Sequence, residues 1–279
     1  MRITHAFTCT GPYAILIMLG IKRVENRSVM PPGGCGRCAV SCSKSFCREE
    51  YGNFVRWASR VLPSGDFDGI PAWTDVQDWP GRIVGTCTCV GRGRNDLRLS
   101  AEEDVGGCGA GLSWDEGYPY WWDLSEVACL DCPIVCRGNV GMWQLPRELA
   151  PSVTQADELA RSVGVTIACA DDARRIFSAA LPLVGANEGF FVLPLDEQNR
   201  TLAAPILVSL GTTAATTAVR PRDVFQTALT KGADAIIVAH NHPSGSTAFS
   251  PQDRHLTETL KGLGESLGIR VLDHLVLVK

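Results

Sequence analysis

Residues 234–253 read DAIIVAHNHPSGSTAFSPQD and have the pattern of a strand, a loop and a helix start. The segment 235–239 is apolar and rich in β-branched residues, which is typical of a short buried strand. Ser250, Pro251 and Asp253 offer an N-cap hydroxyl, a proline at the first helical position and an acid at the third. We therefore expect a buried strand over 234–240 and a helix over 250–267.

Three candidate metal ligands lie in this unit. His240 and His242 are two residues apart at the end of the expected strand, so both imidazoles can project to one side. Asp253 adds a carboxylate from the start of the helix. Three protein ligands leave a fourth position for water, which is the arrangement of catalytic rather than structural zinc. The sequence therefore predicts a catalytic zinc site in this unit.

The 279 residues divide into two halves of different composition. All seven Trp lie between positions 57 and 143, and eleven of the twelve Cys lie between positions 9 and 136. Four of the five His lie in the last forty residues. This distribution predicts two domains, 1–150 and 151–279.

The net charge of −4 is shared evenly by the two halves. Residues 1–150 carry 15 Lys and Arg against 17 Asp and Glu, and residues 151–279 carry 11 against 13. This balance lacks the basic excess of a protein held mainly by phosphates, so any nucleic-acid contact must come from a local cleft. The apolar run 14–21 is too short to span a bilayer and follows no clear basic region. We expect a cytoplasmic protein with mostly reduced thiols and no membrane contact.

The two halves predict different folds. In the second half, strands and helices mix without a strict repeat, so α/β with a mixed sheet is the best class. Strands are expected there over 188–195, 201–209, 234–240 and 269–278, and helices over 154–163, 171–181, 221–231 and 250–267. The first half has short strands and few helices, which indicates a small β-barrel-like domain. Its strands are expected over 37–43, 81–90, 121–124 and 141–145, and its helices over 12–19 and 45–60.

The spacing His-x-His-x7-Ser-x2-Asp, formed by His240, His242, Ser250 and Asp253, resembles the metal motif of JAB/MPN (JAMM) metalloproteases. The neighbouring segments HNHPSG, SPQD and GIRVLDHLV are similar to the RadC branch. The resemblance implies that His240, His242 and Asp253 bind one Zn²⁺ ion, with water as the fourth ligand. It also implies that Glu188 is the general acid/base and that Ser250 helps to hold the developing oxyanion.

This chemistry explains the residue types. Two neutral imidazoles and one carboxylate leave the ion net positive, which lowers the pKa of the bound water toward ~7. A carboxylate, here Glu188, must then accept the proton and pass it to the leaving amine. The reaction implied by the resemblance is hydrolysis of an amide or isopeptide bond in a protein or another amide substrate.

The first half resembles another family. Gly20, Lys22, Glu25 and Arg27 form the pattern Gly-x-Lys-x-x-Glu-x-Arg, which is similar to the signature of ASCH domains. The resemblance spans about residues 1–150 and implies a partly open, PUA-like β-barrel with a cleft for RNA, other nucleic acid or a modified nucleoside. The residues that would line this cleft are Lys22, Glu25, Arg27 and Lys44. Some small members hydrolyse an acetylated cytidine with a Lys and a Thr three residues later, and Glu25 replaces that Thr here.

The cysteines leave a second metal site open. Cys35 and Cys38 form one Cys-x-x-Cys pair, and Cys129 and Cys132, followed by Cys136, form another, so together they could build a structural zinc site. The alternative is that these side chains are free thiols, either buried or on the surface.

Three functions therefore stay open. We favour a zinc-dependent hydrolase of the RadC type that carries an ASCH-like nucleic-acid-binding domain. The second is a nucleic-acid-binding protein associated with DNA repair whose metal is structural. The third is an ASCH-type amidohydrolase acting on a modified nucleoside, with the RadC-like part as an accessory.

Overall fold

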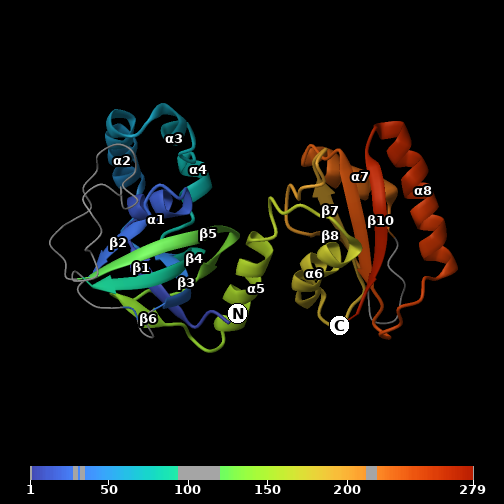
Figure 1. The fold of residues 1–279 in the computed structure, drawn as a ribbon, viewed down its shortest axis with the longest axis horizontal. Coiled ribbons are helices and arrows are strands. Elements are labelled where there is room, and N and C mark those ends of the chain that lie inside the picture. Colours follow the sequence, from blue (N-terminus) through green and yellow to red (C-terminus); the bar gives the residue numbers. More distant parts are fainter. Residues whose placement is uncertain (1, 28–30, 32–34, 94–119, 212–218, 279) are drawn as a thin grey trace. The chain divides into compact units, whose positions relative to one another are not determined.

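The computed structural model describes residues 2–27, 31, 35–93, 120–211 and 219–278. The chain forms two compact units, Met1–Asp157 and Glu158–Lys279 (Figure 1). The first is built on a curled sheet of half-barrel form and the second on a mixed sheet with helices, so the expected mixed α/β class is confirmed. Within the described ranges, no helix is long and apolar enough to cross a membrane.

The sheet of the first unit has six strands in the order β2-β5-β4-β3-β1-β6. Its strands are β1 (His5–Cys9), β2 (Val24–Arg27), β3 (Cys35–Cys42), β4 (Arg82–Gly93), β5 (Tyr120–Val135) and β6 (Met142–Gln144). Strands β1 and β3 are parallel, and the other neighbouring pairs are antiparallel. The helices of this unit include α1 (Gly11–Met18), α2 (Arg48–Val61), α3 (Ser64–Asp68) and α4 (Trp73–Val76).

Helix α1 packs into the core of the first unit because it is apolar on nearly every side. Its last residue, Met18, lies over Gly85 of β4, where an added Cβ would come 2.0 Å from the Met18 sulfur. Only glycine permits this approach.

Strand β5 is longer than the expected strand 121–124, and Glu126, with a φ of 47°, interrupts its regular pattern. Such a bulge hides the continuity of a strand from a periodicity analysis.

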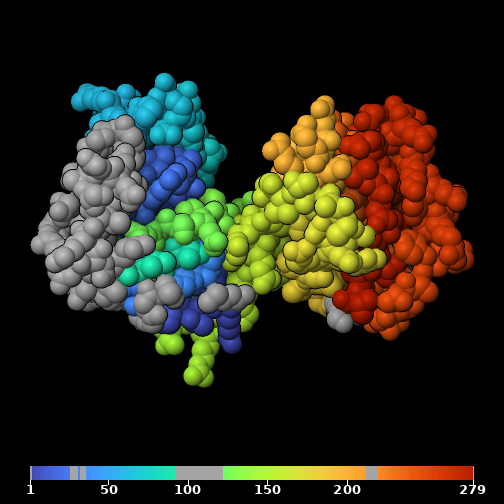
Figure 2. Space-filling view, viewed as in Figure 1, coloured from blue at the N-terminus to red at the C-terminus, as the bar shows by residue number. Residues whose placement is uncertain are grey.

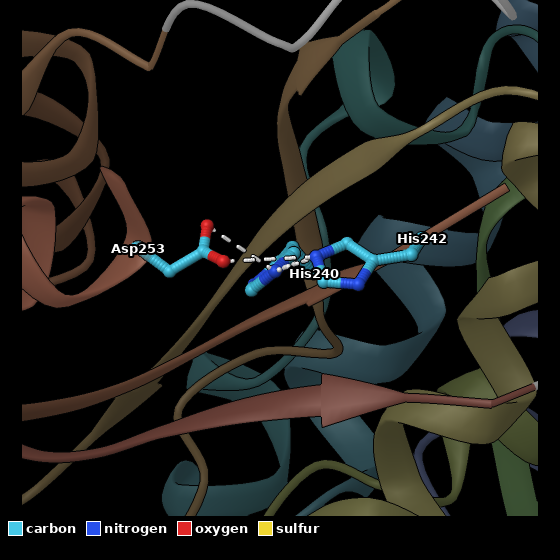
Figure 3. Close-up of side chains that lie close together, drawn as sticks. All are labelled: His240, His242 and Asp253. Atoms are coloured by element: carbon cyan, nitrogen blue, oxygen red, sulfur yellow. Dashed lines mark hydrogen bonds and ion pairs between the residues drawn. The ribbon is translucent and has the colours of Figure 1, made fainter. Parts of the chain in front are cut away.

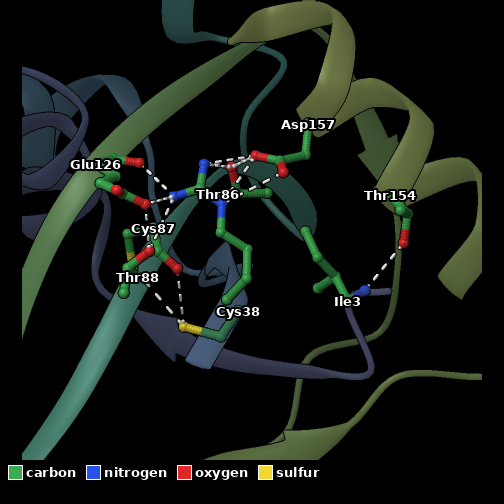
Figure 4. Close-up of polar contacts among 9 residues, drawn as sticks. Ile3, Cys38, Thr86, Cys87, Thr88, Glu126, Thr154 and Asp157 are labelled. Carbon is green, nitrogen blue, oxygen red and sulfur yellow. Dashed lines mark hydrogen bonds and ion pairs between the residues drawn. The ribbon is translucent and has the colours of Figure 1, made fainter. Parts of the chain in front are cut away.

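Helix α5 (Ala150–Ala160) occupies the region where the sequence suggested a junction. Its N-terminal part belongs to the first unit, because the hydroxyl of Thr154 accepts a hydrogen bond from the Ile3 amide at 3.0 Å. Asp157 on the same helix, labelled in Figure 4, binds Arg37 of β3. The first compact unit therefore extends to Asp157, beyond the expected domain boundary after residue 150.

The sheet of the second unit has the strand order β10-β9-β7-β8. Its strands are β7 (Gly189–Leu195), β8 (Ile206–Leu210), β9 (Ala235–Asn241) and β10 (Arg270–Leu277). Its helices include α6 (Ala170–Ala180), η2 (Leu181–Val184), α7 (Pro221–Thr230) and α8 (Pro251–Leu267). Strands β9 and β10 are parallel, and β7 is antiparallel to both β8 and β9. Strand β8 starts later than the expected strand 201–209, because Thr201 is hydrogen-bonded to Ser162 and Val165 instead.

Both faces of this sheet are buried, and alternate residues separate them. Phe191 and Ile237 face a core with α6, whereas Phe190, Ile236 and Val238 face a second core with α7 and α8. Figure 1 shows helices on both sides of the sheet, and Figure 2 shows the surfaces of α8 (orange) and β10 (red) side by side. Since side chains two residues apart share a face, His240 follows Val238 on the face that α7 and α8 cover.

Candidate metal centre

Helix α8 begins as the sequence predicted. The Ser250 hydroxyl oxygen accepts a hydrogen bond from the Asp253 amide at 3.1 Å, and the Asp253 carboxylate accepts one from the Ser250 amide at 2.7 Å. This reciprocal capping box holds the carboxylate at the first turn of the helix. Burial acts to raise the pKa of Asp253, but the hydrogen bonds with Ser250 and the charges of His240 and His242 together hold the pKa below its usual value. Asp253 is therefore a fixed anion.

The structure brings His240, His242 and Asp253 together at the end of β9 (Figure 3). The two Nε2 atoms lie 2.9 Å apart. Oδ1 of Asp253 lies 3.4 Å from Nε2 of His240, and Oδ2 lies 3.7 Å from Nε2 of His242. One donor atom from each of the three residues lies within 4.8 Å of the others, so a strand end and a helix start together form a small triangle of donor atoms.

The triangle fits a zinc ion in size and chemistry. Ligands at the usual zinc distances in tetrahedral geometry are separated by roughly 3.3 Å, and the two imidazole nitrogens lie 2.9 Å apart, each with one oxygen of the Asp253 carboxylate at 3.4 or 3.7 Å. Two imidazole nitrogens and one carboxylate oxygen are also ligands that zinc accepts. A compact set of this kind on two different elements is a candidate metal centre rather than a chance surface cluster.

The two histidines differ in exposure and in their second nitrogen. His240 is 2% exposed, and burial lowers its pKa, with Asp253 opposing this and His242 adding to it. Nδ1 of His240 lies 2.9 Å from Nε2 of His274, which is also buried. His242 is half-buried, and its Nδ1 lies 3.0 Å from the carbonyl oxygen of Ser246. Since a carbonyl only accepts, Nδ1 of His242 carries the proton and its Nε2 keeps a lone pair.

A cavity of about 700 Å³ opens beside the triangle. It is lined by Glu188, His240 and Asp253 together with apolar side chains that include Phe190, Val219 and Leu256. Glu188 directly precedes β7 and is half-buried. Glu188, which is far away in the sequence, therefore adds one further carboxylate to the cavity that the metal-ligating groups line.

Asn241 anchors the segment that carries Glu188. Its side-chain oxygen accepts a hydrogen bond from the Gly189 amide at 2.9 Å, and its side-chain nitrogen donates to the Asn187 carbonyl at 3.0 Å. These two bonds lie on either side of Glu188 and tie its backbone to β9 between the two histidines. Asn241 is 1% exposed, so water cannot replace either bond.

We expect Asn241→Ala to lower the free energy of unfolding of the second unit by about 2 kcal/mol. The estimate counts about 1 kcal/mol for each of two buried hydrogen bonds. Urea unfolding followed by circular dichroism measures the loss. Gln226→Ala on the exposed side of α7 is the matched control and should stay within about 0.5 kcal/mol of the parent. Equal stability of the two variants would contradict the anchoring role.

In the first unit, the structure pairs two of the four cleft residues predicted from the sequence. Nζ of Lys22 lies 3.2 Å from Oε2 of Glu25, donates to the Val24 carbonyl and lies 4.9 Å from the Tyr13 ring centre. Lys22 and Glu25 are 2% and 6% exposed. This pair is a buried ionic cluster.

The other two cleft residues are not joined to this pair by any contact described for them. Lys44 is exposed in the turn after β3, with its aliphatic chain over Gly81. Arg27 ends β2, where its backbone pairs with Tyr120, and its side chain lies outside the described part of the structure. The cleft formed by all four residues stays a prediction.

The cysteines that the structure describes are free thiols. Cys38 of β3 lies opposite Cys87 of β4, with their sulfurs 3.8 Å apart in the core. The hydrogen bond with Cys87 and burial raise the pKa of Cys38. Cys129 and Cys132 are exposed, whereas Cys136 is buried, and the Cys35 side chain lies outside the described residues. Because the Cys38 side chain lies in the core opposite Cys87, its position favours the free-thiol alternative over a zinc knuckle.

The sequence analysis missed Thr257, whose hydroxyl lies 2.6 Å from Nδ1 of His274. Its position four residues after Asp253 places it one turn along the same helix face, which is a signal that the sequence contained. A threonine at that spacing is common in any helix, however, and only the contact with His274 links Thr257 to the site.

Comparison with known proteins assigns the unit that contains this site. Residues 167–279 match the family model of the RadC-like JAB domain. A UPF0758 protein of Desulforudis audaxviator is 47% identical over 91 residues, which are 33% of this chain and 39% of that relative. The UPF0758 protein AM1_4368 of Acaryochloris marina is 48% identical over 92 residues, 33% of this chain and 37% of the relative. The matched regions thus span about two fifths of these relatives.

A crystal structure of a mutant of the ZmASCH protein from Zymomonas mobilis aligns over 54% of this chain and 93% of its own. The identity is 15% and the TM-score is 0.32.

Proposed function

We propose that this protein is a zinc-dependent hydrolase that cleaves amide or isopeptide bonds. The observation that carries the proposal is the triangle of donor atoms from His240, His242 and Asp253, which borders the same cavity as Glu188. The match of the second unit to the RadC-like JAB domain supports it. The three residues of the triangle would hold one Zn²⁺ ion.

The side chains of the cavity have separate roles in this reaction. When bound, zinc supplies Lewis acidity, which eases the deprotonation of water and polarises the carbonyl group of a substrate. Glu188 would accept a proton from the attacking water and deliver it to the leaving amine. The Ser250 hydroxyl, held at the helix start, would donate a hydrogen bond to the carbonyl oxygen as negative charge develops there. Phe190, Val219 and Leu256 would keep the cavity poor in water, which strengthens these interactions.

Metal analysis tests the site. We expect about one zinc per chain in protein purified without chelator, and loss of the metal in His240→Ala and Asp253→Ala. Hydrolysis of a library of peptide and lysine isopeptide substrates, followed by mass spectrometry, should disappear in the same two variants. A parent protein that binds no zinc even when zinc is supplied would contradict the proposal.

A second candidate function belongs to the first unit, which would bind RNA, DNA or a modified nucleoside beside Lys22, Glu25, Arg27 and Lys44. The buried pair of Lys22 and Glu25 favours it, because burying two charges is costly and a ligand-binding role would account for that cost. An assay of acetate release from acetylcytidine separates the two candidate functions. Acetate release from acetylcytidine that survives His240→Ala and is lost in Lys22→Ala would assign the chemistry to this unit.

The remaining alternative is a nucleic-acid-binding protein of DNA repair with a structural metal. It predicts a parent protein that retains zinc and hydrolyses no substrate of the library.

The free thiols of the described cysteines are typical of a reducing compartment, and we place the protein in the cytoplasm.

A further inference from the structure

Two side chains outside the triangle form a hydrogen-bonded row that ends at His240. Nδ1 of His240 lies 2.9 Å from Nε2 of His274 on β10. Nδ1 of His274 lies 2.6 Å from the hydroxyl of Thr257 on α8. That hydroxyl also lies 2.6 Å from the backbone carbonyl of Asp253 and donates to it. The row therefore runs from a helix carbonyl to the imidazole of a metal-ligating residue.

The donor and the acceptor of each hydrogen bond in the row can be deduced from the Asp253 carbonyl at one end. The Asp253 carbonyl only accepts, so the single hydroxyl proton of Thr257 points to it. The Thr257 oxygen must then accept from His274, which places a proton on Nδ1 of that ring. A neutral imidazole has one donor and one acceptor nitrogen, so Nε2 of His274 accepts and Nδ1 of His240 donates.

The surroundings keep this row dry and neutral. His240 and His274 are 2% and 6% exposed, so solvent does not supply alternative partners. The rings of Phe190 and Phe249 lie 5.5 and 5.1 Å from the His274 ring. A second proton on His274 would place a positive charge at a site that is shielded from water.

We propose that Thr257 and His274 are positioning residues that fix His240 in the tautomer whose Nε2 lone pair faces the metal. This inference rests on the proposed zinc site and adds two residues to it. His242 already keeps its lone pair on Nε2 through the Ser246 carbonyl. The row therefore leaves two lone pairs 2.9 Å apart, an arrangement that a metal ion bound by both nitrogens would stabilise. Helix α8 would thus supply a ligand through Asp253 and orient another through Thr257.

Zinc affinity, measured by competition with a chelator, tests the role of the row. We expect Thr257→Val, which keeps the shape and removes the hydroxyl, to weaken zinc binding roughly 10-fold, and His274→Phe to weaken it by up to about 100-fold. Thr257→Ser should restore the affinity of the parent. Thr227→Val is the matched control, because the Thr227 hydroxyl makes the same bond to a helix carbonyl on α7 and contacts no histidine described for it.

Two further measurements exclude a merely structural effect. If Thr257 acts through His274, the double variant Thr257→Val/His274→Phe should bind zinc no more weakly than His274→Phe alone. In the metal-free parent, ¹⁵N chemical shifts of the imidazoles should show His240 and His274 protonated on Nδ1. His240 protonated on Nε2, or unchanged affinity in both single variants, would overturn the inference. Failure of the parent to bind zinc would instead contradict the proposed function, and the tautomers would still be measurable.

Discussion

Glu188→Gln is expected to lower the rate of amide hydrolysis by roughly 10²- to 10⁴-fold, the usual contribution of a general acid/base. Glutamine keeps the size of the side chain but cannot accept the proton of the attacking water. Zinc content should stay the same as in the parent, because the three donor atoms of the triangle come from other residues. Mass-spectrometric rates on the isopeptide library and metal analysis of the same preparation measure both quantities.

The matched control for this variant is Glu197→Gln. Glu197 lies in the exposed turn at the other end of β7, so the same change in charge is made in the same unit away from the cavity. We expect its rate to equal that of the parent. A Glu188→Gln protein that hydrolyses at the parental rate would remove Glu188 from the mechanism. Zinc retained without hydrolysis in the parent would favour a structural metal.

Asp157→Ala is expected to destabilise the first unit by roughly 3–5 kcal/mol, because it leaves the buried Arg37 guanidinium with only the exposed Glu126 carboxylate, 4.0 Å away, as a counter-charge. Nη2 of Arg37 lies 2.5 Å from Oδ1 of Asp157 and 2.9 Å from the Thr86 hydroxyl. The Thr86 hydroxyl donates to the same carboxylate oxygen at 2.6 Å (Figure 4). Both charged side chains are about 5% exposed or less. Removal of the carboxylate therefore breaks a closed polar network.

Tryptophan fluorescence during urea unfolding measures this loss selectively, since all seven Trp lie between positions 57 and 143. The double variant Arg37→Met/Asp157→Leu removes both charges and should recover much of the stability. Asp131→Ala, which removes an exposed carboxylate on β5 of the same unit, should change stability by less than about 0.5 kcal/mol. A loss as large in the double variant as in Asp157→Ala would contradict the unpaired-charge explanation.

The most local elements of the second unit could be predicted from the sequence. The apolar run before His240 predicted β9, and Ser250, Pro251 and Asp253 predicted the start of α8, because capping depends on residues within one turn. The mixed α/β class followed from the order of these elements. Strand β8 was expected too early and β5 too short, because hydrogen bonds of Thr201 and the bulge at Glu126 depend on distant partners.

The contacts that join distant segments could not be predicted in this way. Arg37 and Asp157 are 120 residues apart, and each alone is an ordinary charged residue. His240 and His274 come from parallel neighbours β9 and β10, so their contact depends on strand register. Cys38 had a possible partner in Cys35 by spacing, but pairing of β3 with β4 placed it opposite Cys87.

The sequence by itself determined the identity and spacing of His240, His242 and Asp253, and the caps that hold the carboxylate at the start of α8. Spacing is sufficient there because side chains project in regular directions along a strand and along the first turn of a helix. Only the tertiary structure decided that the cavity beside the triangle contains Glu188, that Asn241 holds its segment, and that Thr257 and His274 reach His240. These contacts depend on sheet register and on the packing of α8 over β10, which arise when separate segments bury their apolar faces together.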